Sequence, residues 1–468
     1  MMHYFAKTLR PENILTLDHD KHPFLTEWRG RFSQDCLGII LPETTQQVSA
    51  CIQIAQEHNI AIVPQGGNTG LVGGQMPKGK RPQVIMSTQK MTKIRDISPQ
   101  DFALTCDAGV PLSTIQTIAH THNRLFPLSL ASEGSATIGG LIATNAGGTG
   151  VLKYGTMRDL VLGLEVVLPN GDIISDTHYL RKNNVGFDPK YLFIGSEGHH
   201  GIVTAASLKL FSQPASEITC FIGVHTPQNA LDILAYLQQA TGDNISEFEL
   251  IPQIGLEFVL KHNDTVRNPL SQFYPWYCLV TATSGFDISI LQNHLLQSLE
   301  MIFTKNLAAD AVIAKNNTES QRLRTIRMLL SHSQKPEGAS IKHDVSVPMR
   351  HIPKLIEQGI IAAQKIVPDI RPCPFGHAGD GNIHFNFSQP INMKPNIFMD
   401  YEAALNTAIF DIVHKLNGCF SAEHGIGSLR IGQLYQYREK SEMTLRNHIK
   451  KTLDPNYLFN PDKGFENL

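Results

Sequence analysis

Two short segments in the second half of the chain carry side chains that could bind a metal ion. The segment GHAGDGNIHFNF contains His377 and His384, and the segment SAEHGIG contains Glu423 and His424. Imidazole nitrogens and carboxylate oxygens are ligands of zinc, and a catalytic zinc site uses three of them and keeps one position open. The segments therefore predict a metal site. The alternative for each histidine alone is a packed or solvated side chain.

The pattern around His384 indicates how these side chains would be positioned. A strand places alternate side chains on opposite faces, so His384 and Asn386 would share one face. The turn at Gly379–Gly381 can then fold His377 back over that polar face. The apolar side chains of the opposite face are Ile383, Phe385 and Phe387.

Glycine-rich loops in the first half of the chain predict a second kind of site. In PQGGNTGLVGG (64–74), consecutive glycines let backbone N–H groups converge on an anion such as a pyrophosphate. The alternative is a tight loop without a ligand. The segment 129–155 has small residues nearly throughout, which lets an extended ligand lie against the backbone. Together with the loop at 195–201, these segments favour a large nucleotide.

Two familiar phosphate-binding motifs are excluded. No glycine cluster contains the G-x-G-x-x-G fingerprint of dinucleotide-binding folds. The segment GQMPKGKR (74–81) approaches a P-loop, but Arg81 replaces the hydroxyl residue that would hold magnesium. The predicted nucleotide is therefore bound in another way.

The elements that must position these loops alternate in type along the first ~210 residues. Pro42 and Thr44 precede the apolar positions Val48, Ile52 and Ala55, a pattern typical of a helix start. Helices are expected at 45–58 and 111–122, and strands at 60–63 and 191–194.

The composition changes near Gln213–Pro214, after which glycine becomes sparse. Amphipathic segments predict helices at 229–239, 288–304 and 352–366. Strands are expected at 218–224, 277–283, 341–347 and 371–375. This pattern predicts an α+β domain with helices on one face of a sheet.

Composition excludes several classes of protein. The 40 basic and 42 acidic residues nearly cancel, so no field of one sign would attract nucleic acid or an anionic membrane. The seven cysteines are scattered without a CxxC pair, which disfavours disulfide frameworks, zinc ribbons and iron–sulfur clusters. The N-terminus lacks the apolar core of a secretory signal, and no stretch approaches the ~20 apolar residues of a membrane span. We expect a cytoplasmic protein without a transmembrane segment.

The first half of the chain resembles a known flavoprotein family. PQGGNTGLVGG, SATIGGLIATNAGGTGVLKYGTMRDLVLGLEVVLPNGDI and LRKNNVGFDPKYLFIGSEG are similar to the PCMH-type FAD-binding domain of the vanillyl-alcohol oxidase superfamily. The resemblance implies a two-part FAD-binding domain and FAD as cofactor. Asn68 stands where some relatives carry a flavin-linking histidine, which implies noncovalent FAD.

The same resemblance implies which residues contact FAD. Those of the first loop, expected at the pyrophosphate, are Pro64, Gly66, Gly67, Asn68, Thr69 and Gly70. Those expected to line the flavin are Ser135, Thr137, Ile138, Gly139, Asn145 and Gly148. Glu197 and Ile202 are expected nearer the adenine, and Asn460 lies in the closing segment that returns to the FAD domain.

The second half resembles the C-terminal domain of the D-2-hydroxyglutarate and D-lactate dehydrogenases of this superfamily. The matching segments are IKHDVSVP, GHAGDGNIHFN and SAEHGIG. The resemblance implies His377, His384 and Glu423 as ligands of a divalent metal, zinc in most relatives, and His424 as the general base.

The resemblance also implies a clamp for a substrate carboxylate. Arg327 and Lys342 would hold carboxylate oxygens, assisted by Ser331 and Asn386. The residues alone favour a different interpretation, a solvated basic helix face that includes Arg324, and Arg324 is an alternative to Arg327.

The expected fold is α+β, with four parts. These are an N-terminal arm (1–33), the PCMH-type FAD-binding domain (34–214), an α+β substrate domain whose sheet is covered by helices (215–415), and a C-terminal segment (416–468) that carries the metal ligand and the base.

The expected activity is the FAD- and metal-dependent oxidation of a D-2-hydroxy acid, with hydride passing to flavin N5. D-2-hydroxyglutarate is the first choice and D-lactate the second. A zinc hydrolase and a non-catalytic binding protein are the alternatives from other classes. The electrons would leave to an external electron-transfer protein or quinone, and the relatives suggest a homodimer.

Overall fold

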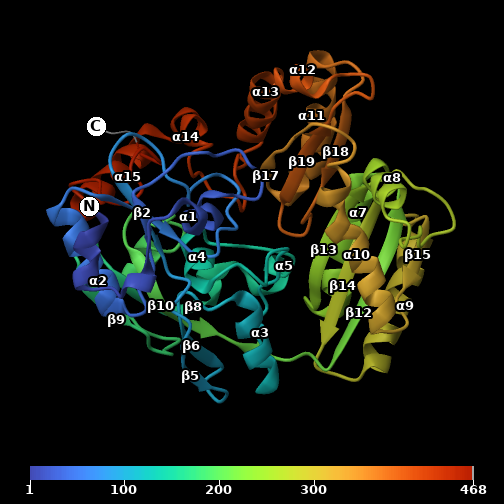
Figure 1. Cartoon of the computed structure of the whole chain (residues 1–468). Coiled ribbons are helices and arrows are strands. Elements are labelled where there is room, and N and C mark those ends of the chain that lie inside the picture. The colour runs from blue at the N-terminus through green and yellow to red at the C-terminus, as the bar shows by residue number, and fades with distance from the viewer. Residues whose placement is uncertain (466–468) are drawn as a thin grey trace. The chain divides into compact units, whose positions relative to one another are not determined.

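The computed structural model describes residues 1–465, and the chain forms two compact units (Figure 1). Three separate stretches build the first unit, and a short insertion from its middle belongs to the second. The first unit comprises Met1–Gly147, Gly155–Gln213 and the described part of Glu423–Leu468, and the second comprises Gly148–Tyr154 and Pro214–Ala422.

The first unit contains two main sheets. The four-stranded sheet has the order β1-β2-β4-β3, in which β4 runs parallel to both β2 and β3. The five-stranded sheet is antiparallel, with the order β5-β6-β10-β8-β9. The strands of the first unit, including a small β11-β7 pair, are β1 (Ile14–Leu15), β2 (Gly38–Ile40), β3 (Ala61–Gln65), β4 (Gln83–Ser87), β5 (Ile94–Ser98), β6 (Ala103–Asp107), β7 (Arg124–Leu125), β8 (Val161–Val167), β9 (Ile173–Asp176), β10 (Ile202–Lys209) and β11 (Phe211–Ser212).

The two helices predicted in the first unit, at 45–58 and 111–122, are present as α2 and α3. The Thr44 side chain accepts a hydrogen bond from the Gln47 N–H and starts α2, and Val48, Ile52 and Ala55 are buried as expected. The helices are α1 (Asp18–Leu25), α2 (Thr45–Glu57), α3 (Leu112–Thr121), α4 (Ile138–Ala143), α6 (Met157–Leu160), α14 (Ile431–Tyr437) and α15 (Lys440–Leu453), with 3₁₀ turns at Met2–Lys7, Pro11–Asn13 and Pro189–Leu192.

The C-terminal stretch completes the parallel sheet of the first unit. Phe459 forms a parallel bridge with Ile62 of β3, and the Asn460 N–H donates to the Ile62 carbonyl at 2.9 Å. Lys450 of α15 is fully buried, and its Nζ donates to the carbonyls of His199 (2.9 Å) and Phe459 (3.1 Å) and to Asp454 (2.6 Å). The last described residues are therefore part of the core of this unit.

The second unit is built around two sheets. The first has the order β13-β14-β12-β15 and is antiparallel. The second has β19 at its centre, with β18 on one edge and β16 followed by β17 on the other. The strands are β12 (Ser216–Val224), β13 (Ile245–Pro252), β14 (Trp276–Ser284), β15 (Asp310–Ile313), β16 (Ser340–Ile341), β17 (Asp344–Ser346), β18 (Arg371–Phe375) and β19 (Asn382–Ser388).

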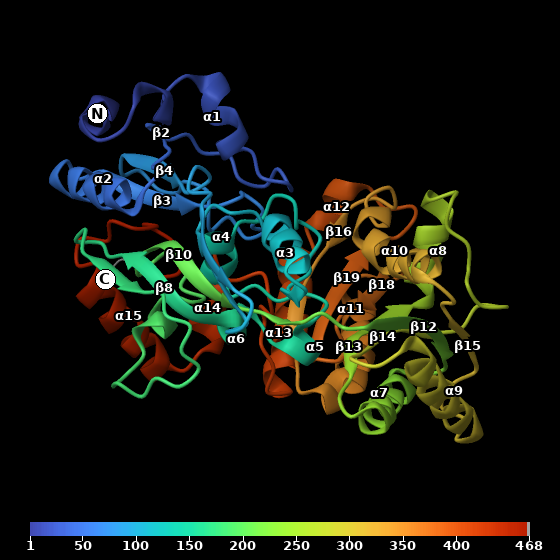
Figure 2. The same ribbon diagram turned by 90° about the horizontal axis from the view of Figure 1, so that it is seen from below.

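Helices cover both faces of the first of these sheets, where the sequence predicted one face (Figure 2). Strands β12 and β14 are buried along nearly their whole length, and strands buried on both faces are near-continuous apolar runs. This is why alternation alone did not show the second layer. The helices of the unit are α5 (Val151–Tyr154), α7 (Pro227–Thr241), α8 (Gln253–His262), α9 (Ile288–Thr304), α10 (Asn317–Ser333), α11 (Ile352–Ile366), α12 (Pro395–Met399) and α13 (Glu402–Lys415), with a 3₁₀ turn at Met349–His351.

One predicted strand was wrong. Tyr191–Ile194 is not a strand, because its first two residues belong to a 3₁₀ turn at Pro189–Leu192. The Asp188 side chain accepts a hydrogen bond from the Lys190 N–H, and Pro189 fixes the backbone of the first turn. Local capping therefore outweighs the apolar run.

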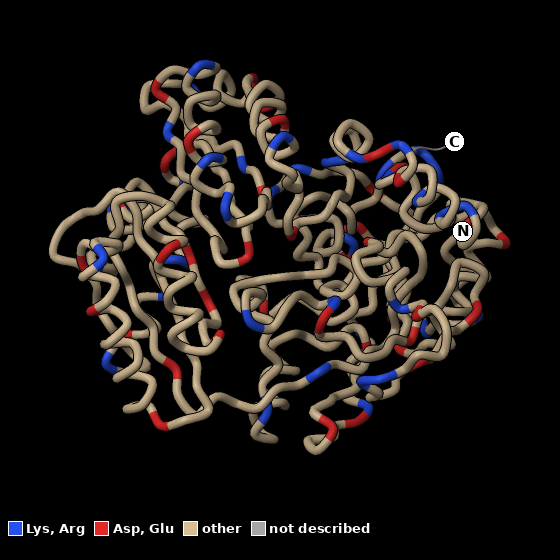
Figure 3. The backbone as a smooth tube through the Cα atoms, turned by 180° about the vertical axis from the view of Figure 1, so that it is seen from behind, with Lys and Arg blue, Asp and Glu red and all other residues tan. Residues whose placement is uncertain are grey.

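The charges of the chain are mixed rather than segregated. Figure 3 shows Lys and Arg interspersed with Asp and Glu along the described residues, consistent with the net charge of −2. Among the helices of residues 1–465, none is long and apolar enough to cross a membrane.

The buried position of Lys450 leads to a stability prediction. We expect Lys450→Ala to lower the free energy of unfolding by about 3 kcal/mol, because it leaves the buried Asp454 carboxylate without its cation. Urea denaturation measures the change. The exposed neighbour Lys451 is the control, and Lys451→Ala should change it by less than about 0.5 kcal/mol. Equal effects of the two substitutions would contradict a structural role for the Lys450 charge.

Candidate active site

Strand pairing places His384 beside a carboxylate that the sequence did not single out. His384 of β19 is directly opposite Asp344 of β17, and the distance from His384 Nδ1 to Asp344 Oδ1 is 3.8 Å. Asp344 is buried, and the Asn382 Nδ2 donates to its Oδ1 at 2.9 Å. On the opposite face of β19, Ile383 and Phe385 are fully buried, so the predicted division of the strand into a polar and an apolar face is confirmed.

Backbone hydrogen bonds hold the segment that carries Glu423 and His424 to the same sheet. Cys419 and Ser346 exchange two of them, at 2.8 and 2.9 Å. The Ala422 N–H then donates to the Asp344 carbonyl at 3.1 Å. The two residues that follow Ala422 are thereby brought to β17.

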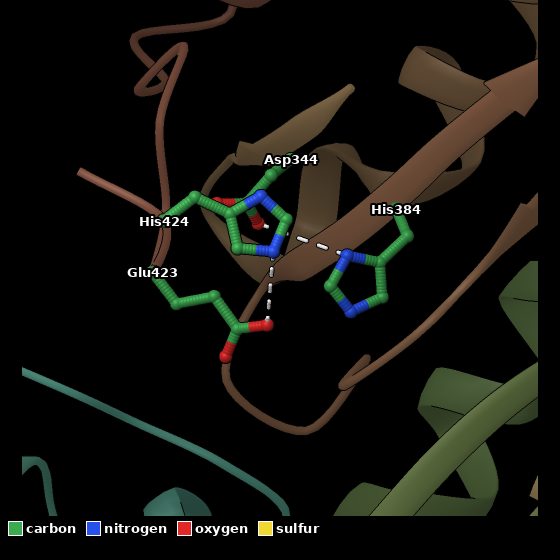
Figure 4. Close-up of side chains that lie close together, drawn as sticks. All are labelled: Asp344, His384, Glu423 and His424. Carbon is green, nitrogen blue, oxygen red and sulfur yellow. Dashed lines mark ion pairs between the residues drawn. The ribbon is translucent and has the colours of Figure 1, made fainter. Parts of the chain in front are cut away.

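Four side chains converge at this point of the fold (Figure 4). Asp344, His384, Glu423 and His424 each offer one ligand atom, and these atoms lie within 4.8 Å of one another. The His424 Nε2 is 3.8 Å from the Glu423 Oε1. Two imidazoles and two carboxylates are a donor set that suits zinc, manganese or cobalt, so the residues present fit a divalent cation. Of these four, His384 and Glu423 were predicted as ligands and His424 as the general base, whereas Asp344 was not predicted.

His377, the remaining predicted ligand, lies next to this group. The centroids of the His377 and His384 rings are 5.5 Å apart, so the turn after Gly376 does fold His377 toward the polar face of β19. The His377 Nδ1 is hydrogen-bonded to the Glu249 carboxylate. Glu249 comes from β13, where Leu250 exchanges backbone hydrogen bonds of 2.9 and 3.0 Å with Gly376.

Arg327 lies at the same buried carboxylate. Its Nε donates to Glu249, and its guanidinium carbon lies 4.9 Å from the centre of the Phe375 ring. Burial by itself would raise the pKa of Glu249, but the charge of the Arg327 guanidinium and the hydrogen bonds from His377 and Arg327 hold it far below its usual value. Glu249 is therefore an anion in the folded protein.

Arg324, the alternative to Arg327, is engaged elsewhere. It forms ion pairs with Glu217 at 2.9 Å and Glu247 at 3.2 Å. Arg327, by contrast, is linked to His377 through the Glu249 carboxylate. The geometry therefore favours Arg327 over Arg324 as a site residue.

The other predicted substrate-binding residues come from α10 and the neighbouring strands. Asn386 is buried on the polar face of β19, and its Nδ2 donates to the Gln334 Oε1 at 3.1 Å. Ser331 is half-buried between Arg327 and Gln334, one helical turn from each, so the three share a face of α10. Lys342 is half-buried in the break between β16 and β17, which splits the single strand predicted at 341–347.

The two glycine-rich loops approach each other in the first unit. A Cβ atom on Gly67 would lie 1.8 Å from the Ser135 carbonyl oxygen, and one on Gly66 would lie 2.5 Å from the Thr137 Oγ1. The Thr137 hydroxyl is buried and has no hydrogen-bond partner among residues 1–465. Backbone-to-backbone contact with an orphaned hydroxyl fits a ligand that is held by main-chain groups, as FAD would be.

The remaining predicted cofactor residues lie around these loops. Pro64 is in β3, and Asn68, Thr69 and Gly70 are in the loop that follows it. Asn68 adopts a φ of 56°, and its Nδ2 donates to the carbonyls of Pro23 (3.0 Å) and Thr26 (2.9 Å). From the second loop, Ile138 and Gly139 open α4, Asn145 follows it, and Gly148 begins the stretch that belongs to the second unit.

Glu197 has a structural task that the sequence did not reveal. Its two carboxylate oxygens accept hydrogen bonds from the N–H groups of Ile426 and Gly427, both at 2.7 Å. Burial raises the pKa of Glu197, and these two hydrogen bonds oppose the rise. The Asn460 Nδ2 donates to the Glu197 carbonyl at 2.7 Å, while Ile202 is buried in an apolar cluster with Ile62. Glu197 thus fixes the loop that follows His424.

Comparison with known proteins agrees with this architecture. The FAD binding domain family matches residues 36–177, and the family described as FAD linked oxidases, C-terminal domain, matches residues 213–464. A solved structure of p-cresol methylhydroxylase with substrate bound superposes with a TM-score of 0.76 at 17% identity, covering 99% of this chain and 96% of that one. Fold and sequence together define an FAD-dependent oxidoreductase.

Relatives that match nearly the whole chain are named as enzymes that act on D-2-hydroxyglutarate or D-lactate. A D-2-hydroxyglutarate–pyruvate transhydrogenase of Saccharomyces cerevisiae is 32% identical over 98% of this chain and 93% of its own length. A mitochondrial D-2-hydroxyglutarate dehydrogenase of Arabidopsis thaliana is 32% identical over 98% of this chain and 80% of its own. A putative mitochondrial D-lactate dehydrogenase of Schizosaccharomyces pombe is 31% identical over 95% and 84%. The chain belongs to the FAD-linked oxidases and is an FAD-dependent dehydrogenase, as the resemblance seen in the sequence implied.

Sequence reasoning missed two acidic residues, Asp344 and Glu249. Asp344 lies in the quoted segment IKHDVSVP, but only the pairing of β17 with β19 shows that it faces His384. Glu249 lies outside every motif that was identified in the sequence. A charged residue in the otherwise apolar run Phe248–Ile251 is the one signal that could have been used.

The contact between the glycine loops leads to a prediction about the cofactor. We expect Gly67→Ala to reduce the flavin content of the purified protein at least about tenfold, because the new methyl group would collide with the Ser135 carbonyl. The measurement is the visible absorbance of bound flavin relative to protein. Gly134 has open space where a Cβ would be, so Gly134→Ala is the matched control and should keep its flavin. Full flavin content in Gly67→Ala would show that the contact between the two glycine-rich loops is not needed to bind FAD.

Proposed function

We propose that this protein oxidises a D-2-hydroxy acid to the corresponding 2-oxo acid, with D-2-hydroxyglutarate as the preferred substrate. The observation that carries the proposal is the convergence of His384, Glu423 and His424 near Arg327 and His377, which are linked through Glu249. A general base, ligands for a cation and a guanidinium for a carboxylate are what this reaction needs. The names of the full-length relatives support the substrate class.

His424 is the proposed general base. Oxidation breaks the O–H and α-C–H bonds and turns the C–O single bond into a carbonyl. The hydroxyl proton goes to an imidazole nitrogen of His424, since histidine accepts protons near neutral pH. Bound FAD supplies the acceptor for the hydrogen that leaves the α-carbon with its electron pair.

We propose His377, His384 and Glu423 as the residues that hold a divalent cation, with zinc as the first choice. Asp344 lies beside His384 and could replace His377 in the ligand set, since it belongs to the group of donors within 4.8 Å of one another. A cation held there supplies positive charge that favours loss of the hydroxyl proton. The open position of a three-ligand site would admit the hydroxy acid.

The substrate carboxylates have two proposed partners. Arg327 offers a planar fork of donors for one carboxylate, and Lys342 offers a point charge. Ser331 and Asn386 are proposed to complete this part of the site. For FAD, the proposed contacts are the first loop (64–70), the residues around α4, and Asn460, as the family resemblance implies.

Three further parts of the proposal concern the electron acceptor, the oligomeric state and the cellular location of the protein. The electrons pass to an external acceptor, an electron-transfer protein or a quinone, because the cysteines in residues 1–465 are single and mostly buried. The protein is proposed to act as a homodimer. Its cytoplasmic location stays a prediction, since several relatives are named as mitochondrial.

The second candidate is a D-lactate dehydrogenase, which the relative from Schizosaccharomyces pombe favours. The two substrates differ by one carboxylate, so the discriminating measurement is the ratio of their kcat/KM values. We expect kcat/KM for D-2-hydroxyglutarate to exceed that for D-lactate by at least about tenfold. The reason is that the site has two cationic side chains, Arg327 and Lys342, so one of them can bind the distal carboxylate that D-lactate lacks. A preference for D-lactate would refute the first choice of substrate.

Removal of the metal tests the proposed cation site. We expect dialysis against a chelator to lower D-2-hydroxyglutarate oxidation at least about tenfold, and added Zn²⁺, Mn²⁺ or Co²⁺ to restore it. The absorbance of bound flavin should stay unchanged, which separates loss of the cation from loss of FAD. Full activity in protein shown to be metal-free would exclude a cation from the reaction.

A further inference from the structure

The buried carboxylate of Glu249 joins two residues that the proposed function assigns to different tasks. One of its oxygens contacts the Arg327 Nε, and the other contacts the His377 Nδ1. The Glu249 side chain is 1% exposed. A carboxylate so buried must have strong partners to remain charged, and here it has one cationic and one imidazole partner.

The position of Glu249 is fixed by the backbone. Residues 245–252 of β13 pair with β14 on one edge, and Leu250 bridges to Gly376 on the other. Gly379 adds a hydrogen bond of 3.3 Å to the Phe248 carbonyl. The neighbours of Glu249 in the chain are thus tied to the turn that carries His377, and the carboxylate has little freedom to move relative to that histidine.

We propose that Glu249 is a positioning residue that sets the geometry of His377 toward the cation and of Arg327 toward the substrate carboxylate. This inference rests on the proposed function and deepens it. Histidines that bind metals commonly donate their second ring N–H to a carboxylate, which fixes the tautomer and the ring orientation. With the Nδ1–H directed at Glu249, the lone pair of His377 is on Nε2.

The same carboxylate orients the guanidinium of Arg327. Because its Nε is engaged by Glu249, the two terminal amino groups are the donors directed away from Glu249, and they form a fork suited to a carboxylate. The aromatic face of Phe375 lies against this guanidinium. Glu249 would therefore link binding of the cation by His377 to binding of the substrate carboxylate by Arg327.

The chain offers a matched control in Glu337. The Glu337 side chain is 5% exposed, and it accepts hydrogen bonds from Arg371, His262 and Lys261. Arg371 is at the far end of β18 from Phe375, and none of the three partners is among the proposed site residues. Loss of the Glu337 charge should disturb the fold to a similar degree without changing the site.

The experiment compares Glu249→Gln with Glu337→Gln in the full-length flavin-loaded protein. Zinc affinity is measured without substrate, by competition with a colorimetric chelator, and kcat and KM are measured with D-2-hydroxyglutarate. We expect Glu249→Gln to weaken zinc binding at least about tenfold and to raise KM, while Glu337→Gln stays within about twofold of the wild type. Glu249→Asp, which keeps the charge but shortens the side chain, should recover part of the zinc affinity.

The outcomes separate this proposal from the proposed function. Zinc affinity and KM of Glu249→Gln equal to those of Glu337→Gln would overturn the positioning role. Wild-type protein that binds zinc but does not oxidise D-2-hydroxyglutarate would refute the function, and the zinc comparison would still decide the role of Glu249. If Glu249→Gln fails to fold, as shown by lost flavin and lost thermal unfolding, Glu249→Asp provides the same comparison.

Discussion

Pairing along both edges of β19 is the constraint on which the candidate site depends. The strand carries His384 and Asn386 toward α10, and it can do so only because its opposite face is apolar and packs on α11 and α13, where Gly359 faces the Phe385 ring. Its two neighbours then place Asp344 and Phe375 at the level of His384. The site is therefore positioned mainly by hydrogen-bonded backbone, which holds side chains more tightly than loops do.

Two carboxylates, the buried Glu249 and the half-buried Glu197, position further parts of the site beyond the sheet. Glu249 holds side chains, whereas Glu197 holds the backbone of the Gly425–Gly427 loop. The donors to Glu249 are the side chains of Arg327 and His377, which are predicted site residues. The donors to Glu197 are backbone N–H groups that closely follow His424, the predicted base. The net charge of −2 conceals this arrangement, since nearly all of the relevant electrostatics is local.

Local patterns in the sequence predicted local structure well. The alternation from Ile383 to Phe387 gave the correct faces of β19, and the helix expected at 288–304 has those bounds in the structure. The family resemblance gave the FAD-binding fold and the class of enzyme. The strand predicted at 191–194 failed because a proline and a capping aspartate favour a 3₁₀ turn there.

What could not be predicted depends on contacts between distant segments. The role of Asp344 follows from pairing with a strand nearly forty residues away, and that of Glu249 from a bridge between Leu250 and Gly376. Apolar periodicity specifies which face of a strand is buried, but it does not specify which strand lies beside it. Buried charges are thus found in the structure first, even where their partners are evident in the sequence.

The discontinuous course of the first unit has a consequence for how the protein is made. Its parallel sheet receives Phe459 beside Ile62, and its core receives Lys450, both from the last stretch of the chain. A ribosome that has synthesised only the residues before 423 has therefore produced a first unit with a missing edge, while the second unit already has its whole sequence. Folding of the cofactor-binding unit must wait until the stretch that begins at Glu423 has been synthesised, and the nascent chain carries exposed β3 backbone until then.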